Sequence, residues 1–155
     1  MRKQIGSIKE LDENYIWRDK AGLITKELGR SVGSKKIYAN MDIVPPKCFS
    51  TKYHSHSQQE EFFLIISGEG TLRLQNKEIT IKEGDFLAKP AGEGIAHTFF
   101  NSGKENLIIL DVGTNEAEDT CYYPDEDVYM LKSNNTRHIV HSESFADGWS
   151  SNPNE

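Results

Sequence analysis

The chain has 155 residues, of which 36% are hydrophobic and 27% are charged, and this composition is typical of a single soluble globular domain. Its formal net charge of −6 argues against a partner with a phosphate backbone, so we expect no nucleic-acid partner. No apolar stretch follows the two basic residues near the start, and no run approaches about 18 apolar residues, so we expect a cytoplasmic protein without a membrane partner.

Residues 1–34 mix short apolar groups with turn-forming glycines, and no helical period continues for three turns. We expect this segment to be an N-terminal arm that packs on the rest of the chain. Apolar and polar side chains alternate from Lys36 to Asp42, until Pro45 and Pro46 stop the pattern. The alternation predicts a half-buried strand.

Short strands separated by turn-forming residues are expected beyond the two prolines. They are predicted at about 48–56, 61–67, 70–75, 78–82, 85–89, 96–101 and 106–113. Such closely spaced strands predict an antiparallel sandwich or barrel, and therefore an all-β fold.

The last third of the chain changes character twice. Seven acids and no Lys or Arg lie between Asp111 and Asp127, which predicts a solvated acidic excursion over 111–127. The short apolar run 128–131 then predicts a strand that returns to the sheet. Beyond Ser133 the sequence is rich in Ser and Asn, so we expect a polar C-terminal tail over 134–155.

Two predicted strands are apolar on both faces. These are Phe62–Ile66 and Leu107–Leu110, and a barrel interior can cover only one face of each. The other face must be covered by the arm, the opposite sheet or another subunit. We favour another subunit, and therefore a homodimer.

Two histidines lie close together in the segment 48–56. In an extended segment, side chains two residues apart project to the same face, so His54 and His56 can direct their imidazoles at one point. Neutral imidazole suits Zn, Cu, Fe and Ni, and a neighbouring carboxylate extends the range towards Mn. The pattern therefore predicts a transition-metal site.

Two acids compete for the carboxylate position of this site. If the next strand begins at Glu61, then Glu61 shares the interior face with Phe63, whereas Glu60 belongs to the loop. We choose Glu61. His97 follows a Pro–Gly turn at the start of a strand and is well placed to close the site, although each histidine taken alone is equally typical of a hydrogen-bonded core residue.

The segment from His54 to Gly68 resembles the first motif of the cupin superfamily, which has the form HxH, three or four residues, E, six residues, G. Here six residues separate Glu61 from Gly68, which favours Glu61 a second time. The segment 84–101 resembles the second motif, with one departure: four residues rather than two separate Gly92 from His97.

The resemblance implies a double-stranded β-helix, the cupin or jelly-roll-like barrel, and we place this barrel at residues 35–133. It also implies a metal ion held by His54, His56, Glu61 and His97. Four such ligands leave two positions open on an octahedral ion, and Mn, Fe, Co, Ni or Zn would fit.

We expect a metal-binding cupin that acts as an enzyme on a small polar molecule, of dioxygenase, decarboxylase or isomerase type. The alternative is a non-catalytic cupin that binds or senses a small ligand. Strand parity places three side chains beside the metal as candidate substrate-binding residues: Lys52, Phe63 and Phe99. The alternatives are a surface lysine at a strand end for Lys52 and core packing for the two phenylalanines. His138 and His141 lie in the polar tail without an accompanying acid, and we expect both to be exposed.

Overall fold

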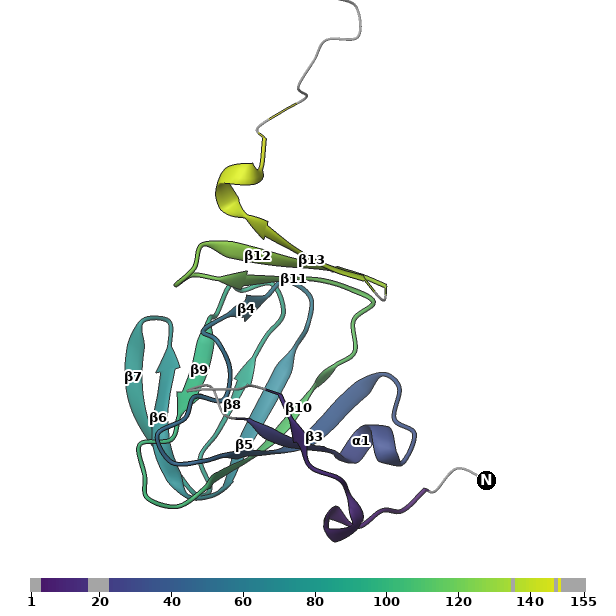
Figure 1. The fold of residues 1–155 in the computed structure, drawn as a ribbon, viewed down its shortest axis with the longest axis vertical. Helices are drawn as coiled ribbons and strands as arrows, with labels where there is room; N and C mark the ends of the chain where they lie inside the picture. The colour runs from purple at the N-terminus through teal and green to yellow at the C-terminus, as the bar shows by residue number, and fades with distance from the viewer. Residues whose placement is uncertain (1–3, 17–22, 135, 147, 149–155) are drawn as a thin grey trace, which may run out of the picture.

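The computed structural model describes residues 4–16, 23–134, 136–146 and 148, so parts of the predicted arm and tail lie outside the described residues. The described chain is built from antiparallel strands in three sheets (Figure 1). The largest sheet has six strands, in the spatial order β1 (Asn14–Tyr15), β2 (Ile24–Glu27), β3 (Ile37–Val44), β10 (Leu107–Thr114), β5 (Glu61–Ser67) and β8 (Phe86–Lys89).

Two smaller sheets complete the architecture. A three-stranded sheet has the order β7 (Lys77–Lys82), β6 (Glu69–Leu74) and β9 (His97–Phe100). A four-stranded sheet lies across one end of the other two (Figure 1) and has the order β13 (Thr136–His141), β12 (Val128–Ser133), β11 (Glu118–Tyr123) and β4 (Ser55–His56).

Helical structure is limited to short pieces in the described residues. These are the four-residue helix α1 (Leu28–Ser31) and the two 3-10 turns η1 (Ile8–Glu10) and η2 (Ser142–Ser144). None of these described helices is long and apolar enough to cross a membrane.

The predicted all-β double-stranded β-helix is confirmed. Most predicted strands are present with ends that shift by one residue, and the strand at 61–67 has the predicted bounds. Alternation explains this success, because Glu61, Phe63 and Ile65 point into the interior while Phe62 and Ile66 point out.

The strand predicted over 48–56 is the main difference. Within this segment only Ser55–His56 forms a strand. Before it, Phe49 makes an isolated β-bridge to Phe100, and His54 makes one to His97. The chain first turns through Lys47, whose φ is 66°, and then buries three consecutive residues, Tyr53 to Ser55. A segment that buries consecutive side chains does not alternate, so parity arguments fail there.

The acidic segment 111–127 is not a solvated excursion over its whole length. It contains the end of β10 and the whole of β11, and Asp119 is buried. The tail also adds a strand to the structure, since β13 pairs with β12 along its full length. His138 and His141 on β13 are both exposed, as expected.

The two-faced apolar strand β5 has one buried and one exposed face. Phe63 and Ile65 belong to the buried core, whereas Phe62 is 40% exposed and Ile66 is 38% exposed. Phe62 stacks on Phe86 of the neighbouring β8, which is itself 70% exposed. The described residues of this chain therefore leave the outer face uncovered, and the homodimer stays a prediction.

Asn101 fixes the loop that follows β9. Its side chain is fully buried, its Nδ2 donates to the carbonyl oxygens of Val44 and Glu105 at 2.7 and 2.8 Å, and its Oδ1 accepts from the Gly103 amide at 2.9 Å. The amide side chain thus satisfies three backbone groups, and its hydrogen bonds to Val44 and Gly103 are fully buried.

Replacing Asn101 by Ala is expected to lower the free energy of unfolding by about 2–4 kcal/mol, because three backbone groups, two of them in buried hydrogen bonds, lose their partner. Urea denaturation followed by far-UV circular dichroism measures the change. Asn115→Ala is the matched control, because that exposed side chain makes one hydrogen bond, to the Lys35 carbonyl, and its loss should cost under about 1 kcal/mol. Equal losses in the two variants would contradict this account.

Candidate metal centre

The three sheets enclose a cavity of about 480 Å³. One part of its wall is aromatic and aliphatic, and another carries acids, amides, hydroxyls and imidazoles. All four metal ligands predicted from the sequence line this cavity: His54, His56, Glu61 and His97. The cavity is therefore the place where a metal and a small ligand could meet.

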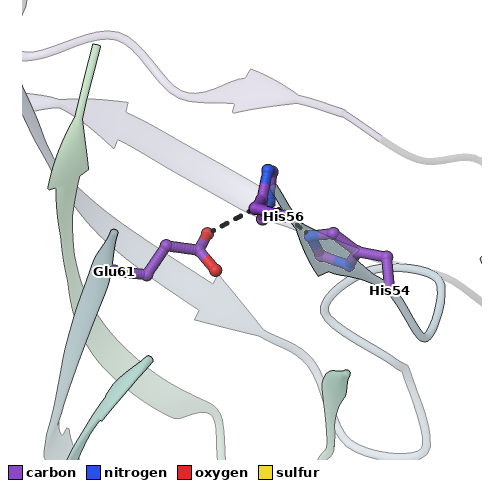
Figure 2. Close-up of side chains that lie close together, drawn as sticks. All are labelled: His54, His56 and Glu61. Carbon is purple, nitrogen blue, oxygen red and sulfur yellow. Dashed lines mark hydrogen bonds and ion pairs between the residues drawn. The ribbon is translucent and has the colours of Figure 1, made fainter. Parts of the chain in front are cut away.

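His54 and His56 face each other at the cavity (Figure 2), and their Nε2 atoms are 3.0 Å apart. The Nδ1 atom of His54 lies 2.8 Å from the Lys52 carbonyl oxygen, and the Nδ1 atom of His56 lies 2.6 Å from Asp119 Oδ2. Both acceptors favour the tautomer with the proton on Nδ1. Each Nε2 is then left with a lone pair that points at the other.

Two facing lone pairs are suited to binding a cation between them. Two nitrogens that lie about 2.1 Å from one ion, at a right angle, are about 3 Å apart. The observed Nε2–Nε2 distance of 3.0 Å therefore fits two neighbouring ligands of a transition metal. The Nδ1 hydrogen bonds supply the outer partners that metal-binding histidines usually have.

Glu61 provides the third group (Figure 2). Its side chain is 5% exposed, and its Oε1 lies 3.6 Å from His56 Nε2. The ligand atoms of His54, His56 and Glu61 all lie within 4.8 Å of one another. Glu60 is exposed and lies outside the cavity wall. The carboxylate beside the two histidines is therefore that of Glu61, which strand parity selected.

Several side chains hold the Glu61 carboxylate. The Lys89 ammonium donates to Oε2 at 2.7 Å, and Gln59 Nε2 donates to Oε1 at 3.2 Å. The Tyr38 hydroxyl lies 3.2 Å from Oε1 and 3.0 Å from Asp111 Oδ1, and can donate to one of them at a time. Burial alone would raise the pKa of Glu61, but Lys89, His56 and His54 together outweigh it and the pKa is lowered. The carboxylate is therefore ionised at neutral pH, as a metal ligand must be.

His97 lies next to this group without joining it. It is fully enclosed, its ring centre is 5.1 Å from that of His54, and its Nδ1 lies 2.6 Å from Lys89 Nζ. The close set of possible ligand atoms contains His54, His56 and Glu61 but not His97. The role of His97 as fourth ligand stays a prediction.

Sequence reasoning missed Asp119, which anchors His56. Asp119 Oδ1 accepts hydrogen bonds from the Ser57 amide, the Ser57 hydroxyl and the Gln58 amide, while Oδ2 faces His56. Burial opposes ionisation of this carboxyl, but the His56 ring, the Gln58 amide and the Ser57 hydroxyl outweigh it and lower its pKa. Its place in an acidic run made it resemble a solvated residue, so no local signal distinguished it.

A second cluster of possible ligand atoms combines His56, Asp119 and Cys121. Burial raises the pKa of the Cys121 thiol to about 12, with a further contribution from the Asp119 charge. The thiol is therefore protonated at neutral pH in the metal-free chain. Cys48 and Cys121 are both free.

The three candidate substrate-binding residues fall in different places. Phe63 and Phe99 are buried and line the cavity beside His97. Lys52 lies outside the cavity wall and forms an exposed ion pair with Glu126. The parity argument placed Lys52 inside because it assumed a regular strand over 48–56, which the chain does not form.

Gly113 allows Tyr38 to reach the centre. Tyr38, Gly113 and Glu61 are opposite one another on β3, β10 and β5, so Tyr38 must cross β10 to approach Glu61. A Cβ atom at position 113 would lie 2.6 Å from the Tyr38 ring and hydroxyl. The hydrogen bond between Tyr38 and Glu61 therefore requires a glycine at position 113.

Comparison with known proteins places the chain in a family. Residues 40–113 match the family model described as a cupin domain. An oxalate-binding protein of Thermotoga maritima is 30% identical over 92 residues, which make up 59% of this chain and 71% of the relative. The chain belongs to the cupin family.

Two solved structures share the fold of this cupin over most of its length. One is a protein of Acidithiobacillus ferrooxidans named provisionally as a sugar phosphate isomerase, with a TM-score of 0.88 and 27% identity over 94% of this chain and 96% of that chain. The other is a cupin-superfamily sugar phosphate isomerase of Silicibacter pomeroyi, with a TM-score of 0.82 and 22% identity over 89% and 92% of the two chains. The second likeness concerns the fold alone.

Two of the candidate ligand imidazoles of this cupin, those of His54 and His97, are neutral when the chain is folded. Burial lowers the pKa of His54 from 6.5 to about 4, and the neighbouring charges of His56 and Lys89 act in the same direction. Burial likewise lowers the pKa of His97 well below its ordinary value. Neutral imidazole is the form that binds a metal.

We expect His54 to destabilise the metal-free cupin in mild acid. Between pH 6.5 and about 4 the unfolded chain protonates this histidine and the folded chain does not, so its contribution to stability falls as the pH falls. Between pH 7.5 and 5.0 the loss from His54 is about 2 kcal/mol. Urea unfolding of metal-free wild type and His54→Gln at the two pH values measures it.

The comparison must be made between variants, because the raised pKa values of Asp42 and Asp111 act in the opposite direction over part of the same range. His54→Gln should lose about 2 kcal/mol less than the wild type on acidification, whereas the exposed His138→Gln should behave like the wild type. An identical pH dependence for all three proteins would show that His54 is not buried in neutral form.

Proposed function

We propose that this cupin is a metal-dependent enzyme that acts on a small polar molecule, and that its reaction is of the isomerase type. The observation that carries the proposal is the pair of anchored imidazoles, whose Nε2 atoms are 3.0 Å apart at the wall of a cavity between the sheets. Glu61 adds an ionised carboxylate beside them.

The proposed metal ligands are His54, His56 and Glu61, with His97 as the fourth. A set of imidazoles and one carboxylate suits a divalent Mn, Fe, Co, Ni or Zn ion. When bound, such an ion would supply a Lewis acid that polarises a carbonyl oxygen of the substrate. The side chains of the chain itself bind and orient the substrate and exclude water from it.

An isomerisation between two neighbouring carbons needs a group that can take up and return a proton. Asp111 is our candidate, because it lines the cavity, accepts from the Tyr38 hydroxyl, and has a pKa raised by burial and then by the charges of Asp42 and Glu61. The 27% identical protein of Acidithiobacillus ferrooxidans, named provisionally as a sugar phosphate isomerase, supports this type over a dioxygenase or decarboxylase.

The second candidate function is non-catalytic binding of a small ligand. The relative in Thermotoga maritima is named for oxalate binding, which favours this alternative. The cavity wall, however, carries the acids Asp42, Glu61 and Asp111, and among its described residues Arg137 is the single Lys or Arg. Oxalate, like the phosphate group of a sugar phosphate, would therefore need a bound metal or Arg137 to offset these acids.

The metal proposal predicts coupled losses of metal and activity. His54→Ala and Glu61→Gln should each lower the bound metal, measured by mass spectrometry after desalting, by at least about tenfold relative to wild type. Both should also abolish interconversion of aldose and ketose phosphates in D₂O, followed by the loss of the substrate proton signal in NMR spectra. Chelator treatment of the wild type should have the same effect, and re-addition of Mn, Fe, Co, Ni or Zn should reverse it.

His138→Ala is the control for this experiment, because His138 is exposed on β13 and outside the cavity wall. It should keep the metal and the activity of the wild type. Metal retained by His54→Ala at the wild-type level would exclude the proposed ligands. Metal binding without turnover of any sugar phosphate, together with binding of oxalate, would favour the second function.

We also propose a cytoplasmic homodimer. Phe62, Ile66 and Phe86 form an exposed apolar patch on the outer face of β5 and β8, and a second copy is the occupant we expect for it. Light scattering coupled to gel filtration should give twice the mass of one chain for the wild type. The Phe86→Glu variant should be monomeric and give the mass of a single chain. A monomeric wild type would contradict the dimer.

A further inference from the structure

A stripe of polar side chains crosses the inner face of the largest sheet. Thr25 of β2 is opposite Asp42 of β3, and Asn40 of β3 is opposite Asp111 of β10. Asp42 and Asp111 are diagonal neighbours on the same face. All four line the cavity, on strands that otherwise contribute to the apolar core.

Two atoms of this stripe have no hydrogen-bond partner among the described residues. They are Thr25 Oγ1 and Asp42 Oδ1, in side chains that are 3% and 8% exposed. Burial raises the pKa of Asp42, and polar contacts with Thr25 and Asp111 partly oppose this, so the three side chains lie close together. Neither Thr25 Oγ1 nor Asp42 Oδ1, however, has a partner at full hydrogen-bond geometry. A buried polar atom without a partner is costly, so the site favours a ligand that can pair with both.

The charges around the stripe restrict what this ligand group can be. Asp42 and Asp111 repel a carboxylate or phosphate, and Arg137, the single Lys or Arg among the described wall residues, is exposed on β13. A hydroxyl group fits, because it donates to a carboxylate oxygen and both donates to and accepts from a threonine hydroxyl. Burial raises the pKa of Asp42 to about 6, so this carboxyl can accept or donate near neutral pH.

We propose that Thr25, Asn40 and Asp42 form a subsite that binds hydroxyl groups of an uncharged, polyhydroxylated part of the substrate. Asp42 lies four residues along β3 from Tyr38, which corresponds to roughly 13 Å and places the subsite away from Glu61. A linear polyol therefore spans from the subsite towards the candidate metal centre. This inference deepens the proposed function, because it names the substrate class for the same cavity.

The test compares three linear five-carbon probes on metal-loaded wild type by isothermal titration calorimetry. Xylitol has five hydroxyls, 1,5-pentanediol lacks the three inner ones, and 5-amino-1-pentanol carries an ammonium group. Xylitol should bind at least about tenfold more tightly than 1,5-pentanediol, because only xylitol can pair with several polar groups of the stripe.

Two substitutions then test the residues. Asp42→Asn and Thr25→Val should each weaken xylitol binding by about tenfold or more and leave 1,5-pentanediol binding unchanged. The matched controls are Asp125→Asn and Thr71→Val, whose side chains lie outside the cavity wall, and both should bind xylitol like the wild type. Thermal unfolding of each variant establishes that it is folded, and Thr25→Val preserves the shape of the side chain if Asp42→Asn does not fold.

Wild-type affinity for xylitol in a folded Asp42→Asn or Thr25→Val variant would overturn the subsite. Tighter binding of 5-amino-1-pentanol than of xylitol would also overturn it, in favour of an ammonium site. Metal content measured on the same samples separates this inference from the proposed function. If the wild type contains its full complement of metal and Asp42→Asn does not change the affinity for xylitol, the subsite is wrong and the proposed function stands. If xylitol binding depends on Asp42 but the wild type binds no metal, the proposed enzyme is wrong and the subsite stands.

Discussion

The hydrogen bond between His56 Nδ1 and Asp119 Oδ2 joins two parts of the molecule that are 63 residues apart in the sequence. His56 lies on β4 and Asp119 on β11, so this contact ties the sheet at the end of the barrel to the segment that carries the candidate ligands. It also leaves His56 Nε2 without a proton and directs it at His54. Without Asp119, the tautomer and the orientation of His56 would both be undetermined.

Buried charge is the second constraint on the centre. Lys89 and Glu61 are 3% and 5% exposed, so their ion pair is buried. Removing either partner of such a pair usually costs about 3–5 kcal/mol, because the remaining charge is left buried and unpaired. The pair therefore holds the carboxylate in one orientation, and Lys89 also occupies Nδ1 of His97. A single ammonium group thus links two of the four residues that the sequence assigned to the metal.

Sequence reasoning succeeded where side chains alternate regularly and failed where they do not. Along β5 the alternation of Glu61, Phe63 and Ile65 with exposed neighbours fixed both the strand and the choice of Glu61 over Glu60. Lys52 was misplaced because the chain before β4 buries consecutive residues. Asp119 and Lys89 could not be found at all, because their roles depend on contacts with His56 and Glu61 that strand pairing creates over long distances in the sequence.

Gly113 shows how a missing side chain can shape a site. The space above it is filled by the Tyr38 ring, which passes over β10 to reach Glu61 and Asp111. A cupin with any larger residue at this position has no room for that ring, and its carboxylate must find another partner. Positions 38 and 113 are therefore expected to covary among relatives: those with a tyrosine at position 38 should have a glycine at position 113.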